Sequence, residues 1–156
     1  MKRLLTLFAL GLLLIAGCKP AEEPIQTGKD WPTYGGNSEG NRYSPLNQIN
    51  AGNVKNLKIA WMYNAAEPVD KNTKLKDDPK AIQCQPIVIR GIMYGTTPEL
   101  KLFAVNAETG AQLWKFEPKK DEQRFNTNRG VTYWKNGGDK RILYSCGANL
   151  YAVNAK

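Results

Sequence analysis

The fold of this chain can be inferred from the segment Leu102-Phe-Ala-Val-Asn-Ala-Glu-Thr-Gly-Ala-Gln-Leu-Trp114. Its first half returns 48 positions further on as Leu150-Tyr-Ala-Val-Asn-Ala-Lys156. A unit that recurs at a fixed spacing of this size is typical of repeat architectures. The second copy stops before the Thr-Gly and the Trp that complete the first copy. We therefore expect the chain to be part of a longer protein.

Short strands separated by turns fill the rest of the repeating unit. The sequence predicts strands over 86–89 and 92–96 around a turn at Arg90-Gly91, followed by strands over 102–106 and 112–117. Asn106 and Gly110 provide turn chemistry between the last two strands, because an Asn side chain bonds nearby backbone and Gly accepts a positive φ. The pattern then restarts with strands over 130–135, 141–146 and 150–154. The loop Asn136-Gly-Gly-Asp139 separates the first two of these.

Four short antiparallel strands in 40 to 50 residues are typical of one β-propeller blade. A further strand is predicted over 58–64 around Trp61, which stands 53 positions before Trp114, as the outer strand of a neighbouring blade. A short helical turn is expected from Asn50 to Leu57, with Asn50 as its cap. The sequence thus predicts an all-β chain holding about two four-stranded blades of a partial β-propeller. The alternative is a small sandwich or barrel in which the repeat is a coincidence.

Two blades cannot close a propeller. Each blade buries its faces against its neighbours, so about three units are usually needed for stability. The sheet edges of an open propeller also stay exposed. We therefore expect this chain to be marginally stable by itself.

The first 17 residues have the pattern of an export signal. A basic start at Met1-Lys2-Arg3 precedes an apolar run from Leu4 to Ile15, which is too short for a stable membrane span. The alternative is a buried N-terminal helix.

The residues that follow resemble the bacterial lipobox, in which a cysteine is acylated and becomes the first residue of the mature protein. Cys18 occupies that position, and it is followed by Lys19 rather than by the Asp that often marks inner-membrane retention in enteric bacteria. We expect residues 1–17 to be a lipoprotein signal peptide and residues 18–29 a flexible tether. The protein is expected in the bacterial cell envelope, lipid-anchored and facing the periplasm, with the outer membrane favoured over the inner.

Composition argues against several kinds of site. There is no histidine, which excludes histidine triads and histidine-ligated metals within this chain. The formal net charge is +8, but the basic residues are spread out and the densest run, residues 70–80, alternates in sign. This pattern indicates solvated surface rather than a nucleic-acid patch. Asp77-Asp78 and Asp121-Glu122 are interpreted as solvated loop charges rather than as metal ligands or acid–base pairs.

Two cysteines remain besides Cys18. An oxidising compartment would allow Cys84 and Cys146 to form a disulfide. Each falls in a predicted strand of a different repeat, however, and we expect two buried free thiols.

The segment from Ala104 to Trp114 is similar to the tryptophan-docking motif of the pyrroloquinoline quinone (PQQ) dehydrogenases. Those enzymes are eight-bladed propellers in which such tryptophans lock one blade onto the next, usually with Asp where this chain has Asn106. A block near the start resembles the mature N-terminus of the same enzymes, most of all their glucose dehydrogenase-like branch. It comprises Asp30-Trp-Pro-Thr-Tyr-Gly-Gly36, Asn41-Arg-Tyr-Ser-Pro-Leu-Asn-Gln-Ile-Asn50 and the stretch from Asn53 to Trp61. The resemblance covers residues 30–156 and implies the N-terminal part of such a propeller.

Two positions are implied to contact the cofactor. Asn128-Arg-Gly-Val-Thr-Tyr-Trp134 resembles the segment that opens the second blade, and Arg129 matches an arginine that reaches the quinone in related enzymes. A guanidinium there polarises a quinone carbonyl and stabilises the anion formed on reduction. Gln83 falls where many members have a cofactor-contacting Glu; it keeps an acceptor and adds a donor but loses the charge. The alternative for Arg129 is a solvated loop arginine.

The resemblance also implies a reaction, in which two electrons and two protons are removed from an alcohol. Thr127 and Asn128 stand where some alcohol-oxidising members have adjacent cysteines, which favours a sugar or polyol as substrate. A respiratory quinone or cytochrome is the implied electron acceptor. The family's catalytic Asp and calcium ligands belong to later blades. No catalytic or metal-ligating residue is therefore assigned here, and the chain alone is expected to be inactive.

A rival function comes from a different class of protein. Lipoprotein scaffolds of the outer-membrane protein assembly machinery are also eight-bladed propellers with similar repeats, and they bind protein partners without catalysis. Such scaffolds are not expected to carry the block at residues 30–50 or an arginine at position 129.

Overall fold

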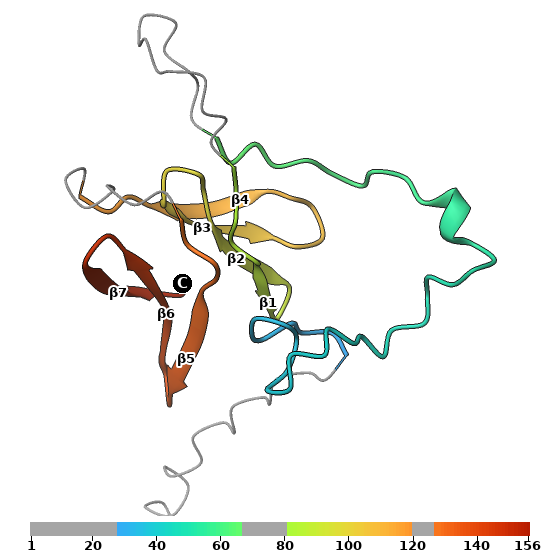
Figure 1. The fold of residues 1–156 in the computed structure, drawn as a ribbon, viewed down its shortest axis with the longest axis horizontal. Coiled ribbons are helices and arrows are strands. Elements are labelled where there is room, and N and C mark those ends of the chain that lie inside the picture. Colours follow the sequence, from blue (N-terminus) through green and yellow to red (C-terminus); the bar gives the residue numbers. More distant parts are fainter. Residues whose placement is uncertain (1–27, 67–80, 120–126) are drawn as a thin grey trace, which may run out of the picture.

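The computed structural model describes residues 28–66, 81–119 and 127–156, and two antiparallel β-sheets form its regular structure (Figure 1). The first sheet contains β1 (Ile87–Ile89), β2 (Ile92–Thr96), β3 (Leu102–Asn106) and β4 (Gln112–Phe116) in sequential order. The second contains β5 (Thr132–Asn136), β6 (Asp139–Cys146) and β7 (Asn149–Asn154). Consecutive antiparallel strands are the arrangement of a propeller blade. The prediction of one complete four-stranded blade followed by three strands of a second is confirmed.

The turns of the first sheet follow from their residue types. Arg90 and Gly91 both have positive φ angles, 51° and 74°, as the two-residue hairpin between β1 and β2 requires. Between β3 and β4, the side-chain oxygen of Asn106 accepts hydrogen bonds from the N–H groups two and three positions on, at 2.9 and 3.0 Å. Gly110 completes that turn with a φ of 73°. Local chemistry is therefore sufficient to place both reversals of the chain.

The two copies of the repeat differ in burial. Leu102 on β3 is fully buried, whereas Leu150, its counterpart 48 positions later, is 76% exposed on β7. The reason is their place in the sheet: β3 lies between β2 and β4, but β7 is the last strand of its sheet. An edge strand leaves side chains and backbone groups open to further packing.

The core lies where the two sheets face each other. Phe116 of β4 meets the rings of Tyr144 on β6 and Tyr151 on β7 edge-on, with centroids 6.4 and 5.4 Å apart. Around these aromatic contacts, one buried cluster combines residues from both sheets and their flanking segments: Cys84, Ile87, Ile89, Tyr94, Leu100, Leu102, Ala104, Val131, Ile142, Tyr144, Cys146 and Ala155. The blades are thus joined through apolar faces, as repeat architectures require.

Trp61 packs on the turn between β3 and β4. Its indole N–H donates to the carbonyl of Ala107 at 3.1 Å, and a Cβ added to Gly110 would lie 2.6 Å from the indole ring. The adjacent Tyr63 ring lies 5.1 Å from that of Phe103 on β3. A tryptophan from upstream therefore docks on the first blade, as the motif predicted.

The predicted strand over 58–64 is wrong as a strand. None of its residues has a strand assignment, although its side chains contact the first sheet. A β-strand needs a hydrogen-bonded neighbour, and the described residues provide no ladder for this segment. Figure 1 shows residues 46–60 as an arc that stands away from both sheets.

The helical turn expected between Asn50 and Leu57 is present as a 3-10 helix over Val54–Asn56. Its cap differs from the prediction, because Asn53 is the N-cap and makes no side-chain bond to the helix. The side chain of Asn50 accepts instead from the N–H of Gly52 at 3.0 Å, just ahead of the helix.

Cys84 and Cys146 are buried and are not joined in a disulfide, so the prediction of two buried thiols is confirmed. Burial raises the pKa of the Cys84 thiol, and hydrogen bonds with Thr96 partly offset that rise. A buried thiol that resists ionisation acts as a small apolar core residue.

Several predictions concern residues that lie outside the described ranges. They are the signal peptide over 1–17, the lipidated Cys18, most of the tether over 18–29, and the loop acids Asp77, Asp78, Asp121 and Glu122. Among the described residues, no helix has the length and apolarity needed to cross a membrane.

Candidate cofactor-binding site

The two cofactor-binding positions inferred from the sequence lie on neighbouring segments. Gln85 and Gly130 form a parallel β-bridge, and the N–H of Gln85 donates to the carbonyl of Arg129 at 3.0 Å. The segments that lead into β1 and β5 therefore run side by side. Gln83 comes two residues before this bridge and Arg129 one residue before it, and both side chains are exposed. The fold thus brings residues 83 and 129 to the same end of the first strands of the two blades.

Asn128 anchors the backbone at Arg129. Its side-chain nitrogen donates to the carbonyl of Ser145 on β6 at 3.0 Å, and its side-chain oxygen accepts from the N–H of Gly130 at 2.9 Å. Asn128 is buried while Arg129 is exposed. The arrangement presents a guanidinium to solvent from a backbone that is held on both sides.

A second arginine lies near this segment, and sequence reasoning did not identify it. The ring of Tyr34 lies close to Gly130, since a Cβ added at Gly130 would be 3.6 Å from Tyr34 Cδ2. Arg42 donates to the Tyr34 hydroxyl at 3.2 Å, and its guanidinium carbon lies 5.7 Å from the centre of the ring. A cation over a tyrosine face at this distance is attracted to it. Nothing local in the sequence pairs residue 34 with residue 130.

The N-terminal block is fastened to the open edge of β1. Trp31 and Val88 exchange two backbone hydrogen bonds of 2.8 and 2.9 Å, and the carboxylate of Asp30 accepts from the N–H of Arg90 at 2.8 Å. A cavity of about 710 Å³ lies within this block and reaches β1, with Trp31, Tyr43 and Val88 among its lining residues. The contacts at Asp30 and Trp31 explain why this block belongs with the first blade.

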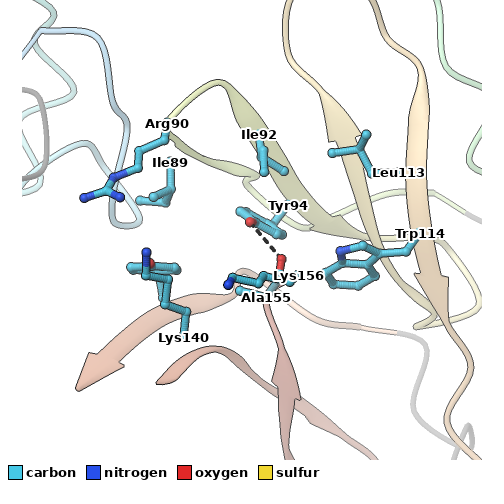
Figure 2. Close-up of a pocket in the computed structure, with 10 residues that line it drawn as sticks. Ile89, Arg90, Ile92, Tyr94, Leu113, Trp114, Lys140, Ala155 and Lys156 are labelled. Atoms are coloured by element: carbon cyan, nitrogen blue, oxygen red, sulfur yellow. Dashed lines mark hydrogen bonds between the residues drawn. The ribbon is translucent and has the colours of Figure 1, made fainter. Parts of the chain in front are cut away.

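Another cavity, of about 290 Å³, lies between the sheets at the hairpin end of β1 (Figure 2). The hydroxyl of Tyr94 donates to the carbonyl of Ala155 at 3.1 Å, and Trp114, Ala155 and Lys156 line the same cavity. The pKa of Tyr94 is raised to about 12, mainly because the ring is buried. The electrostatic effect of nearby Tyr133 raises it further by a smaller amount. Ala155 stands 48 positions after Ala107, the residue that accepts from Trp61. This cavity is therefore the second copy of a blade-docking contact, and we assign it a structural role.

The side chains of Gln83 and Arg129, just before the bridge, have the donors and the charge that suit an electron-accepting quinone. Arg129 offers a permanent positive charge and several N–H donors, and Gln83 offers one acceptor and two donors. Such groups bind quinone oxygens and favour the anionic reduced form. Among the described residues, no group of three or more His, Cys, Asp or Glu side chains is placed to hold a metal ion. The described part of the chain can thus contribute to a quinone site but shows no calcium site of its own.

Comparison with known proteins identifies the family of this chain. Residues 31–156 match the family described as "PQQ: Glucose/ethanol/alcohol dehydrogenase, beta-propeller domain". The quinoprotein glucose dehydrogenase of Escherichia coli (strain K12) is 40% identical over 127 residues, which cover 77% of this chain and 15% of that protein. The dehydrogenase subunit of alcohol dehydrogenase (quinone) from Gluconacetobacter polyoxogenes is 38% identical over 133 residues, which cover 81% and 16%.

A solved structure supports the same relationship. The quinohemoprotein alcohol dehydrogenase from Comamonas testosteroni aligns with a TM-score of 0.67 and 30% sequence identity, over 84% of this chain and 18% of that one. The chain therefore spans less than a fifth of the length of these relatives. Both the matched family and the propeller fold lead to one conclusion: this chain belongs to the PQQ-dependent glucose, ethanol and alcohol dehydrogenase family and forms part of its β-propeller domain.

Proposed function

We propose that this chain is the N-terminal part of a PQQ-dependent dehydrogenase that oxidises a hydroxyl group of a sugar or polyol. The observation that carries the proposal is the parallel bridge between Gln85 and Gly130, which sets the segments that carry Gln83 and Arg129 side by side. The similarity to a glucose dehydrogenase, at 40% identity, supports the substrate class. The relatives reported above are dehydrogenases, so the non-enzymatic scaffold is not favoured.

Within that enzyme, this chain supplies one wall of the cofactor site. The guanidinium of Arg129 binds the cofactor through its N–H donors and favours negative charge on it. Gln83 donates a further hydrogen bond to the cofactor from the neighbouring segment and so helps to orient it. When bound, the cofactor accepts the two electrons removed from the substrate. The base that takes the hydroxyl proton and the calcium ligands come from later blades, and the electrons pass to a respiratory quinone or cytochrome.

The proposal includes a cellular location. Residues 1–17 act as a lipoprotein signal peptide, Cys18 carries the lipid, residues 18–29 form a tether, and residues 30–156 begin the propeller. The basic, apolar and small-residue pattern that ends at Cys18 supports this assignment. Labelling with radioactive palmitate tests it. The native protein is expected to be labelled and to sediment with outer membranes, and Cys18→Ala is expected to lose both properties.

The function is tested on the full-length protein reconstituted with PQQ and Ca²⁺. Glucose, sorbitol, glycerol and ethanol are compared in a dye-linked dehydrogenase assay. We expect turnover with the sugar or the polyols, and a loss of about 10²-fold or more in kcat for Arg129→Ala, comparable to the removal of one oxyanion-stabilising donor.

Arg141→Ala is the matched control, because Arg141 is also exposed but pairs with Asp139 on β6. It is expected to leave turnover unchanged. A protein that does not respond to PQQ would overturn the proposed function, and turnover of ethanol alone would overturn the substrate class.

A further inference from the structure

We infer that Asn128 is a positioning residue, which fixes the backbone on either side of Arg129 and so sets where its guanidinium meets the quinone. This inference rests on the proposed function, because it gives Asn128 a role only through Arg129. Asn128 itself lies beneath the surface and acts through its neighbour.

The burial of Asn128 is unusual for its residue type. It is 5% exposed, and in the part of the chain that the structure describes only Thr96 and Thr97 are polar residues with comparable burial. An amide is costly to bury unless its donors and acceptor are satisfied. Both ends of this amide are satisfied, by Ser145 on one side and by Gly130 on the other. Its environment is therefore specific for an amide side chain.

The hydrogen bonds of Asn128 enclose Arg129. The bond from the Gly130 N–H to Asn128 Oδ1, at 2.9 Å, spans Arg129 and closes a turn around it. The carbonyl of Arg129 is engaged as well, since it accepts from the N–H of Gln85 at 3.0 Å. The backbone is thus held before, at and after Arg129, while the side chain of Arg129 remains exposed.

Asn128 also joins this turn to the second blade. Its side-chain nitrogen reaches the carbonyl of Ser145 at 3.0 Å and the hydroxyl of the same residue at 3.5 Å. The ladder between β5 and β6 ends at the pair Thr132 and Leu143, so this contact lies beyond the last strand pair. The side chain of Asn128 therefore ties the approach to β5 onto β6 where the backbone ladder no longer does so. A binding group held in place before the ligand arrives loses less freedom on binding.

The amide has no equivalent replacement. Alanine removes both hydrogen bonds. Aspartate has nearly the same shape and keeps the acceptor for the Gly130 N–H, but it loses the donor and sets a carboxylate against the carbonyl of Ser145. The two variants are expected to form a graded series.

The test is a double-mutant cycle on the full-length protein, with the dissociation constant of PQQ measured by tryptophan fluorescence in the presence of Ca²⁺. Asn128→Ala is expected to weaken PQQ binding by about tenfold or more, and Asn128→Asp by less. In an Arg129→Ala background, Asn128→Ala is expected to weaken binding less than about twofold further, because coupled residues are not additive. Asn128→Asp provides the same cycle if Asn128→Ala does not yield folded protein.

Asn106→Ala is the matched control. Asn106 closes a similar turn through its side-chain oxygen, but it lies between β3 and β4. It is expected to lower the melting temperature and to leave the dissociation constant of PQQ within about twofold. Equal losses of PQQ binding from the Asn128 variants in both backgrounds, or lower melting temperatures with unchanged PQQ binding, would overturn the inference. If Arg129→Ala loses PQQ binding and the Asn128 variants keep it, the inference fails but the proposed function is supported. If the native protein does not bind PQQ, the proposed function itself fails.

Discussion

Gly110 shows how a single residue permits an upstream tryptophan to dock on the first blade. Its φ of 73° is one that side chains other than glycine resist, and the indole of Trp61 fills the space where a Cβ would stand. The positive φ and the lack of room for a Cβ both apply at position 110. This is why the motif needs a glycine there, and why the tryptophan can approach the backbone so closely.

Gly110→Ala is expected to lower the free energy of unfolding of the chain by about 2–4 kcal/mol. About 1–2 kcal/mol follows from the left-handed backbone and the rest from displacement of the indole. Urea unfolding followed by tryptophan fluorescence measures the change. Gly91→Ala is the control, because Gly91 has a φ of 74° but no atom within 4 Å of an added Cβ. Equal effects of the two substitutions would contradict the steric role of Trp61.

At the scale of elements, the seam between the blades rests on side chains that connect strands of different sheets. Tyr94 of β2 donates to the carbonyl of Ala155, which follows β7, and Phe116 of β4 packs on β6 and β7. Neither contact is local in sequence. The seam should therefore respond to changes of pH and of ring size that leave each sheet intact.

The raised pKa of Tyr94 makes the stability of the seam depend on pH. In the unfolded chain a tyrosine ionises near pH 10, and in the folded chain the pKa is about 12. Between these values the unfolded state has released the proton and the folded state has not, so stability falls as pH rises. Stability is therefore undiminished below pH 10 and is expected to fall by about 2–3 kcal/mol as pH rises to about 12.

Tyr94→Phe should remove this part of the pH dependence. Below pH 10 the variant is expected to be less stable by about 1 kcal/mol, because it lacks the hydrogen bond to Ala155. From pH 10 to 12 the difference should shrink and then reverse. Urea unfolding at a series of pH values measures it. Tyr43→Phe, at a site that is 71% exposed, serves as control; an equal change of slope in that variant would contradict the assignment to Tyr94.

Phe116 is expected to hold the second blade against the first. Phe116→Ala removes its contacts with Tyr144 and Tyr151 and should cost about 2–4 kcal/mol, somewhat below the value for a fully buried ring. Hydrogen exchange should then increase in β6 and β7 more than in β2 and β3. Leu113→Ala, a half-exposed position on the same strand, is expected to have little effect. Uniform loss of protection in both sheets would show that the blades unfold together.

At the scale of the whole molecule, much apolar surface remains open. Six large side chains between residues 43 and 62 are more than half exposed: Tyr43, Leu46, Ile49, Leu57, Ile59 and Met62. Exposed apolar groups of this extent commonly mark a surface that packs against something else. The chain matches only 15% of the E. coli glucose dehydrogenase, and under the proposed function we expect further blades of the same propeller to cover this surface.

The 156-residue chain is therefore expected to show no dehydrogenase activity when mixed with PQQ and Ca²⁺. In the proposed function Arg129 and Gln83 supply one wall of the cofactor site, and no cluster among the described residues can hold the metal. A dye-linked assay with glucose measures this, with the full-length protein as positive control. Turnover by the 156-residue chain alone would show that the active site is complete within it.

Most strands and turns were predictable because they depend on neighbouring residues. The short apolar runs, the turn at Arg90-Gly91 and the bonds of Asn106 each depend on residues within a few positions of each other. The repeat of Leu102–Asn106 then indicated the blade architecture. Gln83 and Arg129 were identified through family resemblance, since a lone exposed Gln or Arg carries no local signal.

Contacts between distant residues could be learned only from the folded chain. The segment around Trp61 has the composition of a strand, yet it forms no ladder because hydrogen-bond partners must come from elsewhere in the fold. Tyr34 meets Gly130, and Asn128 meets Ser145, because packing of the sheets brings those positions together. Local propensity acts over a few residues and therefore specifies strands and turns. The surroundings of Arg129 depend on tertiary packing, because they are assembled from three separate segments of the chain.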